Sequence, residues 1–344
     1  QTFTFNLSNN NPGLFAVAPA IASNGTLTFR TNDNAHGTAT VNVDVVDNGG
    51  TARVGDDNTG SNTFTINIAA VNDAPILTTS GGFFSNPSGN NFTARDNFTA
   101  IDEDNTSSSG DAVSTLLNAA AAINISETSP FAAGAAPGIA VTSVDDANGN
   151  WQFSLDGTNF TDFGSVSANF SRLLDGTNPN HKIRFVPNTD FFGAATIKYR
   201  AWDKTAGVVG DTGDTSTNGG ATAFSAGEVT KTIVVNSVND EPRVSVSDRT
   251  IDEDAGAQTV SSFATGESGA TQGEDGQTFT FNLSNNNSGL FDVQPTIASN
   301  GTLTFTPKAN ANGTATVTTE VVDNGSGVSP NDNTGSNTFD INIT

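Results

Sequence analysis

QTFTFNLSNNNPGLF, the stretch Gln1–Phe15, recurs near the other end of the chain as QTFTFNLSNNNSGLF, Gln277–Phe291. The match runs without a gap over Gln1–Asn48 and Gln277–Asn324, and 36 of these 48 positions are identical. A long self-match at a fixed offset indicates a tandem array, and arrays act through length, spacing and many equivalent surfaces. The sequence therefore predicts a length of rod, built from repeated units.

Apolar and polar residues alternate through the repeated stretch, as in Phe3, Phe5 and Leu7 against the polar residues between them. A period of two places one set on a single face of a strand, where a second sheet can bury it. The closing segment Asp57–Ile68 returns as Asp332–Ile343. The second copy keeps the inward pattern with Phe279, Phe281, Leu303, Phe305, Val317, Val321, Phe339 and Ile341. Such strands, separated by turn residues, predict an all-β protein of sandwich domains.

Composition restricts the class of partner. The chain has 36 acidic and 13 basic residues and a net charge of −23, a surface that repels nucleic acid and anionic membranes and attracts cations. It has no cysteine, which excludes disulfides and thiol chemistry. No apolar run reaches the roughly 18 residues of a membrane helix, so no membrane insertion is expected. Because position 1 is glutamine, we expect a processed or excerpted, secreted chain.

Two similar phrases mark domain boundaries: VNDAP at Val71–Pro75 and VNDEP at Val238–Pro242. Each lies between two strand-like segments, and proline there disfavours helix and cannot donate to a sheet. The predicted domains are residues 1–73, 74–240 and 241–344. The third has the segment Glu241–Gly276 before its QTFTF strand, whereas the first has no counterpart. We therefore expect the first to expose a core face, to be covered either by preceding chain or by strands of a neighbouring molecule.

The middle domain is larger and differs from its neighbours. GIAVTSVD and NWQFSLD around a DANG turn predict a hairpin, with Trp151, Phe153 and Leu155 as its inward row. The segment Ala112–Ala122 fits either a short helix or a buried strand. The Gly/Thr/Asp-rich stretch Gly207–Gly227 predicts a long exposed loop.

Several phrases resemble those of a known family. TATVTTEVVDNG from Thr314, the acidic openings Ile101–Asp104 and Ile251–Asp254, and the phrases FVPNTDFFG (Phe185–Gly193) and FTPKANANG (Phe305–Gly313) are similar to bacterial cadherin-like, or tandem-95, repeats. The resemblance covers essentially the whole chain. It implies Ig-like, cadherin-like Greek-key β-sandwiches joined end to end in secreted adhesins or surface fibres, with neighbouring repeats as partners.

The resemblance also implies calcium, which takes six to eight oxygen ligands from carboxylates and carbonyls. The implied ligands at the second junction are Glu103, Asp203, Asn239 and Asp240, with Glu253 and Asp323 in the third domain and Asp47 and Asp73 at the first junction. The Asp-Arg-Glu segment of cadherins has no counterpart in NDNAHG or PKANANG.

Other chemistry is weakly represented. His36 and His181 stand alone and do not suggest zinc, and no nucleophile motif or phosphate loop occurs. We therefore predict a non-catalytic extracellular array that serves as a stalk or fibre. The alternative is a glycan- or ligand-binding module in residues 74–240, for which Trp151 and Trp202 could stack on a surface sugar unless they are buried in the core. A glycosidase pair at Asp102 and Asp104 is a third hypothesis.

Overall fold

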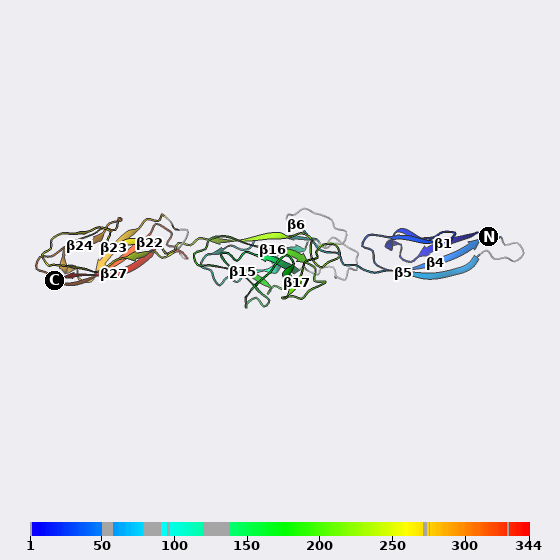
Figure 1. Ribbon diagram of the computed structural model, residues 1–344, viewed down its shortest axis with the longest axis horizontal. Helices are drawn as coiled ribbons and strands as arrows, with labels where there is room; N and C mark the ends of the chain where they lie inside the picture. The colour runs from blue at the N-terminus through cyan, green and yellow to red at the C-terminus, as the bar shows by residue number, and fades with distance from the viewer. Residues whose placement is uncertain are drawn as a thin grey trace.

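The computed structural model describes residues 2–49, 58–78, 91–94, 97–119, 138–270, 274, 276–328 and 330–344. Strands, with the turns and loops that join them, make up almost all of this described part. Three bodies of strands follow one another along the long axis, with the two chain ends at opposite extremes (Figure 1). We call residues 2–68 the first unit, 76–236 the middle unit and 243–344 the third unit.

The third unit is a two-layer sandwich. One sheet has the order β20-β27-β26-β23 and the other the order β21-β25-β24, and β19 pairs with β22 beside them. The alternating residues of the facing strands form one apolar core that includes Phe281, Phe305, Phe339 and Ile341. The bounds are β19 (Arg243–Ser245), β20 (Arg249–Ile251), β21 (Gln258–Val260), β22 (Thr265–Glu267), β23 (Thr280–Asn285), β24 (Phe291–Ile297), β25 (Leu303–Pro307), β26 (Gly313–Val322) and β27 (Thr334–Ile343).

The middle unit has the same central topology with added strands. Its sheets have the orders β17-β14-β11-β16-β18-β8 and β13-β12-β15-β9, and a smaller sheet has the order β10-β7-β6. The bounds are β6 (Ile76–Thr78), β7 (Asn91–Ala94), β8 (Ile101–Asp102), β9 (Asp111–Ala112), α1 (Val113–Leu116), β10 (Leu117–Ala119), β11 (Gly138–Val144), β12 (Gly149–Ser154), β13 (Thr161–Asp162), β14 (Phe170–Asp175), β15 (Lys182–Pro187), β16 (Gly193–Trp202), β17 (Thr212–Asp214) and β18 (Val229–Asn236).

The first unit repeats the second half of the third unit. Its sheets have the orders β1-β4-β5 and β2-β3, and their pairing registers match those of β23, β26, β27, β24 and β25. The bounds are β1 (Phe3–Asn9), β2 (Phe15–Ile21), β3 (Leu27–Thr31), β4 (Gly37–Asp47) and β5 (Asn58–Ile68). The prediction of an all-β chain of sandwich units is confirmed.

Three predictions for the middle unit were wrong in part. β11 and β12 are not a hairpin: β11 pairs with β14 and β16, whereas β12 pairs with β13 and β15 in the opposite sheet. The reason is that β11 is a central strand with both of its edges already paired. Leu155 is 40% exposed rather than inward, because it follows the end of β12.

The stretch Gly207–Gly227 is also not simply an exposed loop. It contains β17, and Ala223 and Phe224 join Trp202 in a second small apolar cluster on the outer side of the large sheet. The segment Ala112–Ala122 includes both alternatives, a single helical turn followed by a strand, over its described part.

The duplication provides a stability test at one core position. Thr319 is fully buried and its hydroxyl has no hydrogen-bond partner, whereas the matching residue of the first unit is Val43. We predict that Thr319→Val raises the free energy of unfolding of the third unit by about 1 kcal/mol, because it removes a desolvated hydroxyl at constant volume. Urea denaturation of the full chain measures this. The reverse change Val43→Thr should lower the stability of the first unit, and a destabilised Thr319→Val protein would contradict the prediction.

Candidate functional site

The second linker is held by both units that it joins. Three successive backbone N–H groups donate to side-chain oxygens: Val238 to Glu103 Oε1 at 2.6 Å, Asn239 to Asn331 Oδ1 at 2.7 Å, and Asp240 to Glu274 Oε1 at 3.0 Å. Glu103 belongs to the middle unit, and the other two acceptors lie on the side of the third unit. Because each bond fixes a different peptide group, the linker is held in one conformation against both units and is not a flexible connection.

The Asn239 side chain is the centre of this clamp. Its Nδ2 donates to the Asp332 carbonyl at 2.6 Å and to Asp323 Oδ2 at 3.2 Å, and its Oδ1 accepts from Gln277 Nε2 at 2.7 Å. An amide is suited to this position because it donates and accepts at once.

Two glycines allow the linker to lie against the third unit. A Cβ added at Gly335 would fall 1.7 Å from the Pro242 carbonyl oxygen, and one at Gly325 would fall 1.7 Å from Asn239 Oδ1. Only a residue without a side chain permits the linker backbone and the Asn239 side chain to approach so closely.

The first linker uses the same device. Asn72 Nδ2 donates to Asp203 Oδ2 at 3.0 Å and to the Thr222 carbonyl at 2.9 Å, and the Ala74 N–H donates to the Gly220 carbonyl at 2.7 Å. Asn72 and Asn239 occupy the same place in their VND phrases, and each contacts the aspartate that follows the long strand of the next unit. The two junctions are therefore built on one plan.

Acidic groups gather at the second junction, and the charge of Arg243 only partly offsets theirs at Asp240. Burial raises the pKa of Glu103, and the charges of Asp240 and Asp104 act in the same direction. Burial, followed by the charges of Asp104 and Asp190, raises the pKa of Asp240 to about 6.

Buried oxygen atoms in this region lack hydrogen-bond partners. Glu103 Oε2, Asp240 Oδ2, Glu274 Oε2 and Gln277 Oε1 are all in this state, and Glu103 and Glu274 are 2% and 9% exposed. A buried carboxylate oxygen without a donor is unfavourable unless a cation or a proton approaches it. However, among the residues that the structure describes, no three His, Cys, Asp or Glu side chains lie close enough together to hold a metal ion. The donor set has the hard oxygen chemistry of a calcium site, although the side chains have not converged on one point.

The structure brings together four of the predicted ligands, Glu103, Asn239, Asp240 and Asp323, at the second junction. Asp203 lies instead at the first junction, against Asn72. The reason is strand direction: β16 runs antiparallel to β18, so the end of β16 lies opposite the end from which the second linker leaves.

The remaining candidates lie apart from these. Asp47 is paired with Phe3 at the start of β1, away from the first linker, and occupies the place of Asp323 in its own unit. Glu253 donates its backbone N–H to Thr344 at the C-terminal end of the third unit. Asp73 lies within the first linker beside Asn72. Ligation of calcium by any of these residues stays a prediction.

Sequence reasoning missed Glu274, Gln277, Asn331 and Asp190. Gln277 is the first residue of the repeated QTFTF stretch and Glu274 lies just before it, so a comparison of the two copies directed attention to the strand and away from the acid before it. Asp190 was available as the single acid in FVPNTDFFG, and it is a buried residue with a left-handed backbone.

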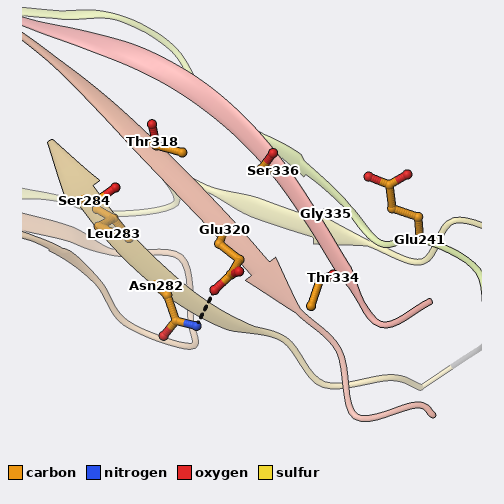
Figure 2. Close-up of a pocket in the computed structure, with 9 residues that line it drawn as sticks. All are labelled: Glu241, Asn282, Leu283, Ser284, Thr318, Glu320, Thr334, Gly335 and Ser336. Atoms are coloured by element: carbon orange, nitrogen blue, oxygen red, sulfur yellow. Dashed lines mark hydrogen bonds between the residues drawn. The ribbon is translucent and has the colours of Figure 1, made fainter. Parts of the chain in front are cut away.

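Evidence for a sugar site is lacking in the described part of the chain. Trp151 and Trp202 are each 1% exposed, and the Trp202 indole N–H donates to the Ala206 carbonyl, so both rings are core residues. A hollow of about 470 Å³ lies on the outer face of the third unit, where Asn282 donates to Glu320 at 2.9 Å and Thr318 and Ser336 stand beside them (Figure 2). Its lining has no aromatic ring on which a sugar could stack. None of the described helices is long and apolar enough to cross a bilayer.

No protein-family model and no curated protein sequence matches the chain. Among solved structures it is similar to mouse protocadherin-24 EC1-3, with a TM-score of 0.44, 14% identity and coverage of 99% of this chain and 90% of that one. It is also similar to mouse cadherin-23 EC22-24 (TM-score 0.38, 14% identity, 99% and 86% covered) and to Drosophila N-cadherin EC1-4 (TM-score 0.38, 15% identity, 99% and 66% covered). At such low identity and TM-score, function has to be argued from the chain's own residues.

The glycine contacts yield a test of linker docking. We predict that Gly335→Ala costs about 2 kcal/mol of docking free energy, because the new methyl group would overlap the Pro242 carbonyl. Faster proteolysis within residues 237–242 measures the loss. Gly289→Ala is the matched control, since the nearest atom to its added Cβ lies 3.9 Å away. Equal proteolysis of the two variants would show that the linker is not seated on the third unit.

The raised pKa of Asp240 sets the direction of a pH effect in calcium-free buffer. Because the folded chain holds this proton more tightly than the unfolded chain, this contribution to junction stability is fully present below the unfolded pKa of 3.8 and is lost as pH rises through the folded pKa of about 6. We predict that Asp240→Asn stabilises the docked junction by about 1 kcal/mol at pH 7.5, after solvent screening, and by less at pH 5. Urea denaturation at both pH values measures the difference, with Asp292→Asn, a change at an exposed acid, as control. An Asp240→Asn protein that is less stable than wild type at pH 7.5 would rule out this explanation.

Proposed function

We propose that this chain is a non-catalytic extracellular spacer, a stalk or fibre segment of a bacterial surface adhesin or filament in which β-sandwich units act in series. The observation that carries the proposal is the repeated clamp: the same asparagine of two successive linkers binds the same aspartate position of the next unit. A repeated junction of this kind sets the spacing and angle between units, which is what a rod requires and an enzyme does not.

Seating both linkers on the following unit also limits bending. A free linker lets neighbouring units sample many angles. The second linker restricts them through three backbone N–H groups bonded to side chains, and the first through the Asn72 side chain and the Ala74 N–H. Load applied to the chain ends passes through each sandwich and each linker in turn. The units therefore extend the reach of whatever they carry.

We further propose that calcium stiffens the second junction. Support comes from the partnerless buried oxygens of Glu103, Asp240 and Glu274, from the raised pKa values of Glu103 and Asp240, and from the net charge of −23. Calcium would add positive charge and would take these partnerless oxygens as ligands. Glu103 from the middle unit, Asp240 from the linker and Glu274 from the third unit would hold it, and their convergence would draw the three parts together.

The experiment compares calcium binding and linker protection in full-length variants. We expect wild type to bind calcium with a dissociation constant of about 0.1–1 mM, as extracellular modules do, and calcium to slow proteolysis of residues 237–242. Glu103→Gln should weaken that binding by about tenfold or more, because it removes one ligand charge. Glu253→Gln is the matched control, since Glu253 has the same place in the third unit but no following linker in this structure.

Calorimetry gives the affinities, and small-angle scattering gives the end-to-end dimension. Loss of the same binding in both variants, or no calcium uptake at millimolar concentration, would remove calcium from the proposal. A chain that stays extended without calcium would still support the spacer role, because the clamp contacts involve no ion. Wide variation of inter-unit angle with and without calcium would argue against that role as well.

A further inference from the structure

His181 of the middle unit is a buried base that accepts a backbone hydrogen bond. The residue is 6% exposed, and its Nδ1 accepts the Asp175 N–H at 3.1 Å. A ring nitrogen that accepts an N–H has to be unprotonated, so the fold selects the neutral imidazole with its proton on Nε2. The backbone is held as well, because the His181 N–H donates to the Asn178 carbonyl and the His181 carbonyl accepts the Val113 N–H. The position of the ring is therefore tied to the turn between β14 and β15.

Asp175 connects this ring to the end of a second strand, β16. Its carboxylate forms an ion pair with Lys204 and accepts the Thr177 N–H at 2.8 Å. Burial acts to raise the pKa of Asp175, but the bonds from Lys204 and Thr177 outweigh burial and hold the pKa below its usual 3.8. Lys204 has a left-handed backbone, with φ of 67°, which is costly for a residue other than glycine. The ion pair helps to hold Lys204 in that conformation.

Lys204 directly follows the aspartate that receives the first linker. Asp203 is 6% exposed, and its Oδ2 accepts from Asn72 Nδ2 at 3.0 Å. A displacement of the Lys204 backbone would therefore be passed to Asp203 through a single peptide bond. One line of contacts joins His181 to the first linker, through Asp175 and Lys204.

The surroundings of His181 disfavour its protonation in the folded chain. Burial lowers its pKa from the usual 6.5; the Asp175 charge acts in the opposite direction, and the Lys204 charge lowers the pKa further. Of the elements beside it, β14 contributes Asp175, the segment after β16 contributes Lys204, β15 begins with Lys182, and β9 begins with Asp111. The Asp111 carboxylate already accepts a neighbouring N–H and hydroxyl, at 2.9 and 2.7 Å.

We propose that His181 is an acid-sensitive latch of the first junction: protonation at Nδ1 releases the corner at Asp175 and, through it, the linker contact at Asp203. A proton on Nδ1 turns an acceptor into a donor that faces the Asp175 N–H, and it places a second positive charge near Lys204. The Asp175 peptide then has to turn away, and the carboxylate moves with it. Lys204 loses the partner that holds its left-handed backbone.

The pH effect has opposite signs at the two junctions. Because folding lowers the pKa of His181, its contribution to stability is fully present above pH 6.5 and is lost as pH falls through the lower folded-state pKa. At the second junction the raised pKa of Asp240 makes acid stabilising in calcium-free buffer. A fall from pH 7.5 to pH 5 should therefore loosen the first linker and stabilise the second. This inference rests on neither calcium nor the spacer role, because it uses only contacts of the middle unit and its linker.

The test uses the full 344-residue chain in calcium-free buffer at pH 7.5 and pH 5. The chain has two histidines, so nitrogen NMR of the imidazole rings identifies His181 by comparison with a His36 variant. We expect a neutral ring protonated at Nε2 at pH 7.5, which titrates below pH 6.5. The Ala74 N–H, which donates to the Gly220 carbonyl, reports linker docking. Its hydrogen exchange, corrected for the intrinsic rate at each pH, should become about tenfold or more faster at pH 5.

Matched substitutions separate the latch from a general effect of acid. His181→Asn keeps an acceptor near the Nδ1 position but gains no proton, so its corrected Ala74 exchange should be equal at the two pH values. Lys204→Gln should speed that exchange at both pH values, while His181 titrates at a higher pH because a neighbouring positive charge is gone. His36→Asn should keep the wild-type response, since Asn312 is the matching residue of the third unit. Protection of the buried strands β11 and β16 establishes that each variant is folded.

Four results would overturn the proposal: a neutral ring protonated at Nδ1 at pH 7.5, titration of His181 above pH 6.5, Ala74 exchange that does not follow that titration, or an unchanged pH response in His181→Asn. If His181→Asn does not fold, the comparison of the Ala74 and His181 midpoints in the wild-type chain decides. Loss of protection throughout β11 and β16 at pH 5 would mean that the whole middle unit unfolds, and would reject a local latch.

Discussion

Parallel pairing between the opening strand and the last strand of a unit is the constraint on which this structure depends. β8 pairs parallel with β18, and β20 pairs parallel with β27. The pairing closes one edge of the large sheet, and it also fixes where the acidic residues after the opening strand lie. Because the two strands run in the same direction, Glu103 lies at the same end of the middle unit as the linker that leaves β18. The contact between Glu103 and the Val238 N–H follows from that direction.

The same constraint explains the asymmetry between the two copies. The sheets of the first unit keep every pairing of their counterparts except those made by the opening segment, and the core residues beneath that segment become exposed. A sheet face is therefore complete only when its covering strand is present, however well its own sequence is patterned. The two stretches are identical at 36 of 48 positions, yet matching residues are not equally buried. A residue on a sheet face is buried only when a second layer covers that face.

Much of the fold could be predicted from the sequence because period-two alternation reports directly which residues face a second layer. Phe281, Phe305, Phe339 and Ile341 were found in this way. Strand partners were harder. β11 and β12 are adjacent in sequence and joined by a plausible turn, yet they belong to opposite sheets. No local sequence signal distinguishes a hairpin from a connection between the two sheets of a sandwich. Asp203 was assigned to the wrong junction for a related reason, since the pole at which a strand ends is set by its neighbours. Glu274 lies before the duplicated strand, where the repeat itself carries no information.

The acidic cluster at the second junction differs from the rest of the structure, because it buries carboxylate oxygens that have no hydrogen-bond partner. Elsewhere in the described chain, many buried polar side chains have partners: the Tyr199 hydroxyl donates to the Leu116 carbonyl, and the Ser171 and Thr215 hydroxyls bond to each other. The partnerless buried atoms there belong to hydroxyl, indole and guanidinium groups and not to carboxylates. At the junction, Glu103, Asp240 and Glu274 each bury an oxygen without a partner, and their like charges repel. Local violations of this kind concentrate where a protein exchanges stability for a response. A junction held by hydrogen bonds alone would be rigid under all conditions, whereas one that also gathers carboxylates whose charge is only partly offset is sensitive to whatever neutralises them. The hydrogen-bonded clamp determines where the linker lies, and the carboxylates determine how firmly it stays there.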